Sequence, residues 1–333
     1  MVWIEFLISA AVITFAAMQL SKYGDVIGLR TKLGGAFAGT LLLAAATTLP
    51  ELLTTVTSIR AGVPDLAAGN LFGSNMINIM LLAILDMVHY RRRVSRKNAE
   101  KHALAGSLTV LMIGLAIFFI LADIPAVLRL GNFVVGMDGL TMIIIYLLAM
   151  SLLSKQSRQH ALPVPAEDIP DDVPSLKTAL AWFAGAVVVL VFATPRLVDA
   201  SSRIAELTGL GATFIGSTLV AFVTSLPEAV TTVAAARIGA DDMAIGNLFG
   251  SNMFNMVSIG IADLFLAGER FFAVIDPSFV LIGAIGLLMT VFALISTLAR
   301  LERRIWFLEI DSIILILSYF AGMYLLYTRG IAP

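Results

Sequence analysis

Two glutamates stand in apolar stretches, and each directly follows a proline. The first occurs in TTLPELLTTVTS (47–58), where Pro50 precedes Glu51, and the second in TSLPEAVTTVAA (224–235), where Pro227 precedes Glu228. An acidic side chain at the centre of a membrane helix costs about 2.5 kcal/mol or more, so two of them indicate a site that binds a cation. The alternative is that both carboxyls are protonated and only join helices by hydrogen bonds.

The composition predicts an integral membrane protein. Of the 333 residues, 59% are apolar and 14% are charged, and the mean hydropathy is +0.94. A helix needs about 20 apolar residues to cross the hydrocarbon core. We therefore expect an all-α polytopic fold with ten spans, near residues 2–20, 34–59, 65–88, 103–122, 134–153, 178–195, 209–236, 242–266, 278–299 and 307–327.

The chain is an internal duplication with a constant offset of 177 residues. Over 47–79 against 224–256, 20 of 33 positions are identical and no gap is needed. Five spans per half is an odd number, so the second half enters the membrane from the opposite side. Inverted repeats with proline-interrupted helices are typical of secondary transporters, whose sites lie at the midplane. The predicted units are repeat 1–153, a cytoplasmic linker 154–177 and repeat 178–333.

The depth of the polar residues follows from helix geometry. Glu51 lies ten residues before the turn expected at 61–64, and Ser74 lies ten after it. At about 1.5 Å per residue, both are roughly 15 Å deep, which is half of the hydrocarbon core. The same count places Glu228 and Ser251 at this level from the other face of the membrane.

The prolines have a predicted role beside the glutamates. Proline has no amide hydrogen, so Pro50 and Pro227 leave the carbonyls of Ala46 and Val223 without their helical donors and bend each helix. Unpaired carbonyls at this depth require a protein or water-filled surrounding. We expect the bends to turn backbone carbonyls of four residues into the site: Ala44, Thr47, Ala221 and Thr224.

Amides and hydroxyls accompany the carboxylates. In GNLFGSNMIN (69–78), Asn70, Ser74 and Asn78 follow one another at four-residue spacing and share a helical face. The copy GNLFGSNMFN (246–255) repeats this with Asn247, Ser251 and Asn255. An all-oxygen set suits Ca²⁺, Na⁺ or Mg²⁺, and the absence of cysteine excludes thiolate sites.

Charge distribution predicts the orientation. Of the 22 Lys and Arg residues, 16 fall in the loops after odd-numbered spans, so these loops face the cytoplasm and both termini lie outside the cell membrane. The basic segment 89–101 is the largest contributor. The net charge of −1 gives no indication of a nucleic-acid partner, and neither a cofactor nor an obligatory protein partner is expected. Asp86 and Asp263, also related by the offset, are expected to be solvated at helix ends, with ion entry as the alternative.

The paired motifs TTLPE…GNLFGSNMIN and TSLPE…GNLFGSNMFN resemble the α-repeats of the cation/Ca²⁺ exchanger superfamily, particularly prokaryotic Na⁺/Ca²⁺ exchangers. The resemblance covers the whole chain. It implies that Glu51 and Glu228 are the central ligands shared by Ca²⁺ and the competing ions. It further implies that the flanking ligands are Ser74, Ser251, the carbonyls of Ala44, Thr47, Ala221 and Thr224, and the hydroxyl residues Thr48 and Ser225.

One departure from the family pattern concerns charge. In well-described Na⁺/Ca²⁺ members, one of the positions that match Asn78 and Asn255 is an aspartate, whereas here both are asparagine. The site then offers at most two negative charges, enough to neutralise one Ca²⁺, two Na⁺ or two H⁺. Stoichiometry and electrogenicity are left open by this difference.

The resemblance implies a Na⁺/Ca²⁺ antiporter and not an enzyme. Exchange of H⁺, or of another divalent cation, is the first alternative. A cation channel would use the same oxygens but does not need inverted halves, and an intramembrane hydrolase would need a nucleophile and base or paired catalytic aspartates, which the midplane positions do not supply.

Overall fold

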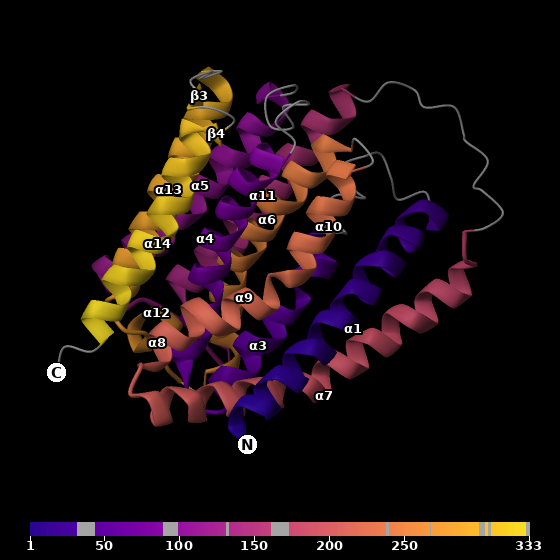
Figure 1. The fold of residues 1–333 in the computed structure, drawn as a ribbon. Helices are drawn as coiled ribbons and strands as arrows, with labels where there is room; N and C mark the ends of the chain where they lie inside the picture. Colours follow the sequence, from indigo (N-terminus) through magenta and orange to yellow (C-terminus); the bar gives the residue numbers. More distant parts are fainter. Residues whose placement is uncertain are drawn as a thin grey trace.

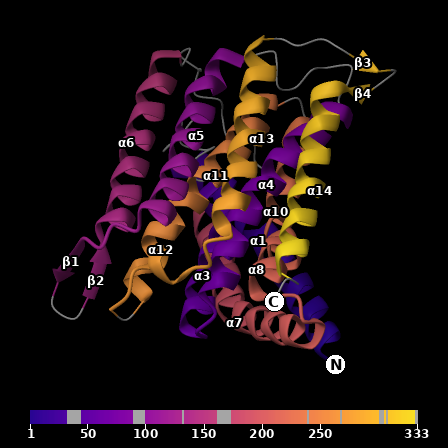
Figure 2. The same ribbon diagram turned by 90° about the vertical axis from the view of Figure 1, so that its left-hand side faces the viewer.

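The computed structural model describes residues 1–31, 44–88, 99–130, 133–160, 173–237, 240–266, 268–299, 304–305 and 308–330. These residues form a bundle of helices with two short hairpins (Figures 1 and 2). The longer helices are α1 (Val2–Thr31), α3 (Leu49–Arg60), α4 (Pro64–Val88), α5 (Ala99–Ala122), α6 (Met137–His160), α7 (Leu176–Thr208), α10 (Leu226–Arg237), α11 (Asp241–Ala262), α13 (Phe279–Ala299) and α14 (Ile310–Gly330).

Short elements connect or extend these helices. A broken segment precedes α10 and consists of α8 (Ala212–Ile215), the π-helical turn η1 (Gly216–Val220) and α9 (Ala221–Thr224). The 3₁₀ turn η2 (Asp263–Phe265) ends α11, and α12 (Phe271–Val274) precedes α13. The antiparallel pairs β1 (Val127–Leu130) with β2 (Phe133–Gly136), and β3 (Arg304–Ile305) with β4 (Leu308–Glu309), were not expected from the sequence.

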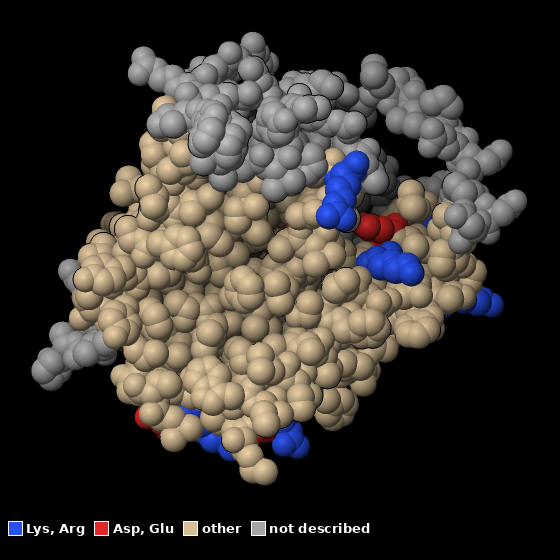
Figure 3. Space-filling view, viewed as in Figure 1, with Lys and Arg blue, Asp and Glu red and all other residues tan. Residues whose placement is uncertain are grey.

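The fold is that of a helical membrane protein. Within the described residues, eight helices are long and apolar enough to cross a membrane, or nine if the bent pair of segments Ala212–Thr224 and Leu226–Arg237 counts as one span. The predicted span 34–59 lies partly outside the described residues. On the face shown in Figure 3, charged side chains lie near the two ends of the bundle, and the surface between them carries none.

Some boundaries differ from the predicted ones. The sixth span was predicted to end at Pro195, but α7 continues through this proline to Thr208. A proline removes one helical hydrogen bond without forcing the chain to turn, and a neighbouring helix can stabilise the interruption. Likewise, α6 continues to His160, beyond the predicted start of the linker at residue 154.

Two helices form the centre of the bundle. In the most apolar windows of α4 and α11, 83% and 78% of the residues are buried, against 33% for α1 and 17% for α7. Helices α1 and α7 pack side by side along one flank of the bundle (Figure 1). They share a core cluster with the α8–α9 segment, separate from the main core formed around α4, α5, α11 and α13. The start of α1 and the end of α14 lie at the same end of the bundle.

Glycines bring α4 against the broken segment. A Cβ on Gly73 would lie 2.5 Å from the carbonyl oxygen of Ser217, and one on Gly216 would lie 2.7 Å from that of Leu66. Real Cβ atoms do not approach oxygen this closely, so only glycine permits the contact. Gly69 and Gly73, four residues apart on α4, therefore serve the close packing of α4 against this segment.

Candidate cation site

Each glutamate lies in the first turn of a helix that begins at a backbone break. Thr48 has φ −87° and ψ 0° before α3, and Ser225 has φ −83° and ψ 1° before α10. The segments on either side of Ser225 are bent by 41°. The two breaks therefore occur at matching positions, two residues before Pro50 and Pro227, and each sets a glutamate at the start of a new helix.

The two carboxylates are buried and close to one another. Glu51 is 1% exposed and Glu228 is 0% exposed, and they lie near enough for their charges to repel. Two buried like charges are unfavourable without a compensating cation or protons. The structure thus brings together the two residues that the sequence placed at the same depth from opposite faces.

Hydroxyl groups reach across from one half of the chain to the glutamate of the other. The Thr48 hydroxyl donates to Glu228 Oε1 at 3.2 Å, and those of Thr47 and Ser251 also lie on the Glu228 side. In the same way, Thr224 and Ser225 lie beside Glu51. Each LPE motif therefore supplies one carboxylate and the hydroxyls that face the opposite carboxylate.

A second pair of contacts also joins a threonine of one half of the chain to a residue of the other half. The Thr47 hydroxyl lies 3.3 Å from Asn247 Oδ1 and 3.4 Å from the Ser251 hydroxyl. Its counterpart, Thr224, donates to Asn70 Oδ1 at 2.8 Å. Asn70 and Asn247 share a helical face with the predicted ligands, but their Oδ1 atoms already accept from threonine. They hold the LPE segments against α4 and α11.

Several buried oxygens at this level lack a hydrogen-bond partner within the described residues. Elsewhere in the bundle, buried hydroxyls donate to the carbonyl four residues back, as Thr109 and Thr290 do at 2.9 and 2.7 Å. At the site, the hydroxyl of Ser74 makes no such bond. Hydrogen-bonding capacity left unused inside a protein is costly, and these atoms suit a hard cation. They are Glu51 Oε2, Glu228 Oε2, Ser74 Oγ, Ser225 Oγ, Asn78 Oδ1 and Asn255 Oδ1.

The alanine carbonyls predicted to be ligands already hold hydrogen bonds. The Ala44 carbonyl accepts the Thr48 amide at 3.0 Å and the Thr48 hydroxyl at 2.6 Å. The Ala221 carbonyl accepts the Ser225 amide at 3.0 Å and lies 3.4 Å from the Thr224 hydroxyl. A cation bound by these carbonyls would have to share their oxygens with these donors.

Sequence reasoning did not single out Asn75 and Asn252. Both are nearly fully buried, at 2% and 0% exposure, and both bond to asparagines across the interface between α4 and α11. The signal available in the sequence was their identity in the two copies of GSNM, directly after Ser74 and Ser251.

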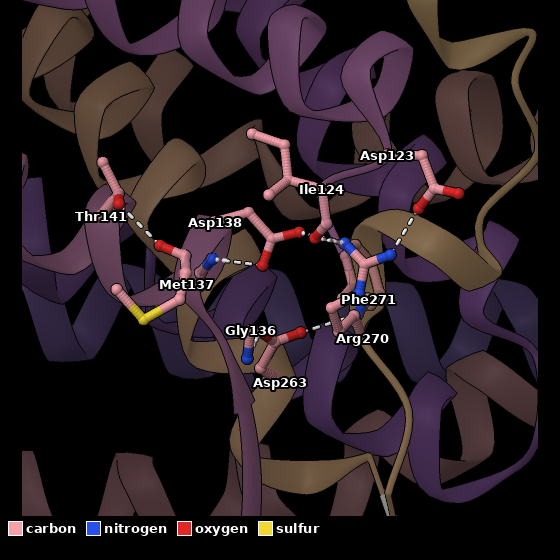
Figure 4. Close-up of polar contacts among 10 residues, drawn as sticks. Asp123, Ile124, Gly136, Met137, Asp138, Thr141, Asp263, Arg270 and Phe271 are labelled. Carbon is pink, nitrogen blue, oxygen red and sulfur yellow. Dashed lines mark hydrogen bonds and ion pairs between the residues drawn. The ribbon is translucent and has the colours of Figure 1, made fainter. Parts of the chain in front are cut away.

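Asp263 is a correction to the sequence analysis. We expected a solvated carboxylate, but its side chain is 1% exposed. It accepts the backbone amides of Gly136 at 2.9 Å and Phe271 at 2.6 Å (Figure 4). This carboxylate therefore joins the end of α11 to the hairpin and to α12. The side chain of its counterpart, Asp86, lies outside the described residues.

A buried ion pair lies beside Asp263. Arg270 contacts Asp138 at 2.9 Å and also pairs with Asp123 (Figure 4). Burial acts to lower the pKa of the Arg270 guanidinium, but hydrogen bonds and charge from Asp123 and Asp138 outweigh it and hold that pKa above its ordinary value. This cluster connects loops at one end of the bundle.

The atoms that line the central site indicate which kind of ion it can bind. Among the described residues, no group of three or more His, Cys, Asp or Glu side chains could hold a metal ion. Two carboxylates with neutral hydroxyl, amide and carbonyl oxygens are a weaker set than a closed metal centre. Such a set suits a hard cation that must also leave.

The chain is similar to known proteins over most of its length. The family model described as "Sodium/calcium exchanger protein" matches residues 1–155 and 178–328. Over 311 residues, the chain is 25% identical to the putative antiporter CaxA of Alkalimonas amylolytica, covering 87% of each chain.

Two solved structures share the fold. The sodium-calcium exchanger NCX_Mj superposes with a TM-score of 0.60 at 20% identity, covering 97% of this chain and 99% of that one. The H⁺/Ca²⁺ exchanger CAX superposes with a TM-score of 0.67 at 12% identity, covering 99% and 89%. At these identities the superpositions establish the architecture, and proteins of two different ion couplings share it.

Proposed function

Because the chain belongs to the sodium/calcium exchanger protein family, we propose that it is a secondary active antiporter that exchanges Ca²⁺ for Na⁺. The observation that supports this proposal most directly is the pair of buried carboxylates, Glu51 and Glu228, each faced by hydroxyls of the opposite motif. Ca²⁺ and the coupling ions would compete for these same oxygens.

The proposed architecture is ten membrane crossings in two inverted five-helix repeats, 1–153 and 178–333, joined by a cytoplasmic linker at 154–177. Support comes from hydrogen bonds that recur under the 177-residue offset. Thr47 with Asn247 has its counterpart in Thr224 with Asn70. The position of α1's start and α14's end at the same end of the bundle is consistent with an even number of crossings.

The proposed ligands are the twelve residues predicted from the sequence. Glu51 and Glu228 carry the charge, and the remaining positions supply neutral oxygens. The unpartnered oxygens of Ser74, Asn78 and Asn255 support their inclusion. The other members are Thr47, Thr48, Thr224, Ser225 and Ser251, with the carbonyls of Ala44 and Ala221.

Alternating access is the proposed mechanism. The α1 and α7 pair, in which α7 has the lowest buried share of the candidate membrane helices at 17%, would slide against the other helices and expose the site to one side at a time. Moving two bare carboxylates through an occluded state is costly because each lacks a partner in a low-dielectric surrounding. Neutralisation by Ca²⁺, or by two monovalent cations, removes that cost and couples the two fluxes.

The coupling ion is the open part of this proposal. Two negative charges balance one Ca²⁺ or two Na⁺, but a third Na⁺ would leave a net positive site. Two protons would also neutralise the adjacent carboxylates, and Asn78 and Asn255 add no charge. This neutral pair favours H⁺/Ca²⁺ exchange as the second candidate. We further propose a cell-membrane location with both termini outside, based on the distribution of Lys and Arg.

Reconstitution into liposomes tests the function. An outward Na⁺ gradient is expected to drive ⁴⁵Ca²⁺ uptake, and Glu51→Gln and Glu228→Gln are each expected to reduce it to background. If a pH gradient drives uptake and a Na⁺ gradient does not, the protein is an H⁺/Ca²⁺ exchanger. Ca²⁺ flux that survives both substitutions would show that the site is placed wrongly.

A further inference from the structure

Four asparagines form a crossed set of hydrogen bonds between α4 and α11. Asn78 donates from Nδ2 to Asn252 Oδ1 at 2.8 Å. Asn255 donates from Nδ2 to Asn75 Oδ1 at 3.0 Å. The two bonds are related by the 177-residue offset, and all four side chains are at most 2% exposed. This contact lies where the two most buried helices of the bundle meet.

The direction of these bonds distinguishes two roles. Asn78 and Asn255 use their amide hydrogens in the contact, and their Oδ1 atoms have no partner within the described residues. Asn75 and Asn252 use their Oδ1 atoms as acceptors. An amide whose NH₂ group is held by a partner cannot rotate to present nitrogen where oxygen is needed. The acceptors thus fix which atom of the donors faces the site.

We propose that Asn75 and Asn252 are positioning residues that hold Asn255 and Asn78, respectively, with their amide oxygens available to the transported cation. This role rests on the proposed function. It requires no contact between the ion and either positioning residue. It also explains why GSN recurs in both copies with asparagine at a position that the family ligand set does not use.

The crossed hydrogen bonds also indicate which helices stay together during transport. Each amide that serves the site is held by a residue of the other half of the chain. A further contact, from Asn252 Nδ2 to the Asn75 carbonyl at 3.4 Å, joins the same two helices. Helices α4 and α11 would therefore stay fixed to one another, and their ligands would keep their geometry while α1 and α7 change position.

A double-mutant cycle on Ca²⁺ affinity tests the proposal. Asn252→Ala is expected to raise the KM for Ca²⁺ about tenfold, the effect of losing about 1.4 kcal/mol, which is the scale of one hydrogen bond. In an Asn78→Ala background, it is expected to add less than about twofold because the group it positions is gone. In an Asn255→Ala background, the full tenfold effect should remain. The maximal rate should change less than KM in each case.

Asn252→Asp provides a second, isosteric variant. It keeps the acceptor oxygen for Asn78, and an added negative charge cannot by itself weaken binding of a divalent cation. Its KM is expected to stay closer to wild type than that of Asn252→Ala. The Ca²⁺-dependent rise in unfolding temperature of the detergent-purified protein should follow the same order, which reports binding without transport.

Two outcomes would overturn the positioning role. One is an equal effect of Asn252→Ala in the Asn78→Ala and Asn255→Ala backgrounds, as general destabilisation would give. The other is a KM for Asn252→Asp as high as that for Asn252→Ala. Failure of the proposed function looks different, because the wild-type protein itself would then neither bind nor transport Ca²⁺.

Discussion

The Thr48 hydroxyl offers a sharp test of the crossed arrangement. It donates to Glu228 Oε1 at 3.2 Å, and both side chains are almost fully buried. A hydrogen bond to a charged group contributes about 1.5–3 kcal/mol. Thr48→Val removes this donor while keeping the shape, so the KM for Ca²⁺ is expected to rise about tenfold to a hundredfold.

A matched control variant separates the effect of losing the contact with Glu228 from the effect of losing a hydrogen bond within the helix. The single hydroxyl hydrogen of Thr48 is shared between Glu228 and the carbonyl four residues back, that of Ala44, which lies 2.6 Å from the hydroxyl oxygen, and Thr48→Val removes both contacts. Thr55 is equally buried and donates to the carbonyl of Glu51 at 2.8 Å in the same manner. Thr55→Val therefore loses a comparable backbone bond, and its KM is expected to stay within about twofold to threefold of wild type. The assay is initial ⁴⁵Ca²⁺ uptake into proteoliposomes across a range of Ca²⁺ concentrations.

The second half of the chain supplies a rescue variant. Its counterpart of Thr48 is Ser225, so a serine hydroxyl is compatible with this backbone position, and Thr48→Ser is expected to retain near wild-type affinity. The reasoning is refuted if Thr48→Val and Thr55→Val raise KM equally. It is also refuted if Thr48→Ser loses as much affinity as Thr48→Val.

Other predictions concern stability. Gly73→Ala places a Cβ 2.5 Å from a backbone oxygen and is expected to destabilise the protein by about 1–3 kcal/mol; Gly114→Ala, where no atom lies within 4 Å, should leave the unfolding temperature in detergent unchanged. Arg270→Leu leaves the buried carboxylate of Asp138 without its cation and is expected to cost about 3–5 kcal/mol. Arg203→Leu, which breaks an exposed pair, should cost at most about 1 kcal/mol. Equal unfolding temperatures within either pair of variants would contradict the close packing at Gly73 or the buried ion pair of Arg270.

The sequence was sufficient for features that depend on local pattern and symmetry. The break near Pro50 and its copy near Pro227 follow from the missing amide hydrogens, and the common depth of Glu51 and Glu228 follows from counting residues to the turns. Both glutamates are indeed buried and close to one another. The family assignment from the paired motifs is confirmed by the family model.

Features that depend on packing between the halves could not be predicted. Nothing local indicates that Thr48 faces Glu228 and not Glu51, because this depends on how α3 and α10 approach one another. The burial of Asp263 depends on amides supplied by Gly136 and Phe271, which are distant in sequence. Helix α7 passes Pro195 because packing against α1 outweighs one lost hydrogen bond.

The asparagine pairs give a structural reason for the neutral side chains at positions 78 and 255. Asn255 donates an amide hydrogen to Asn75 Oδ1, and an ionised aspartate at 255 has no hydrogen to donate. An aspartate there would either remain protonated or require the Asn75 amide to turn and donate instead. Both crossed bonds form with neutral amides as donors, so the charge of the site rests on Glu51 and Glu228 alone. Exchange that moves one Ca²⁺ against two monovalent cations would then leave the net charge of the loaded site unchanged, and measurements of Ca²⁺ uptake with the membrane potential clamped at different values should show little dependence on voltage.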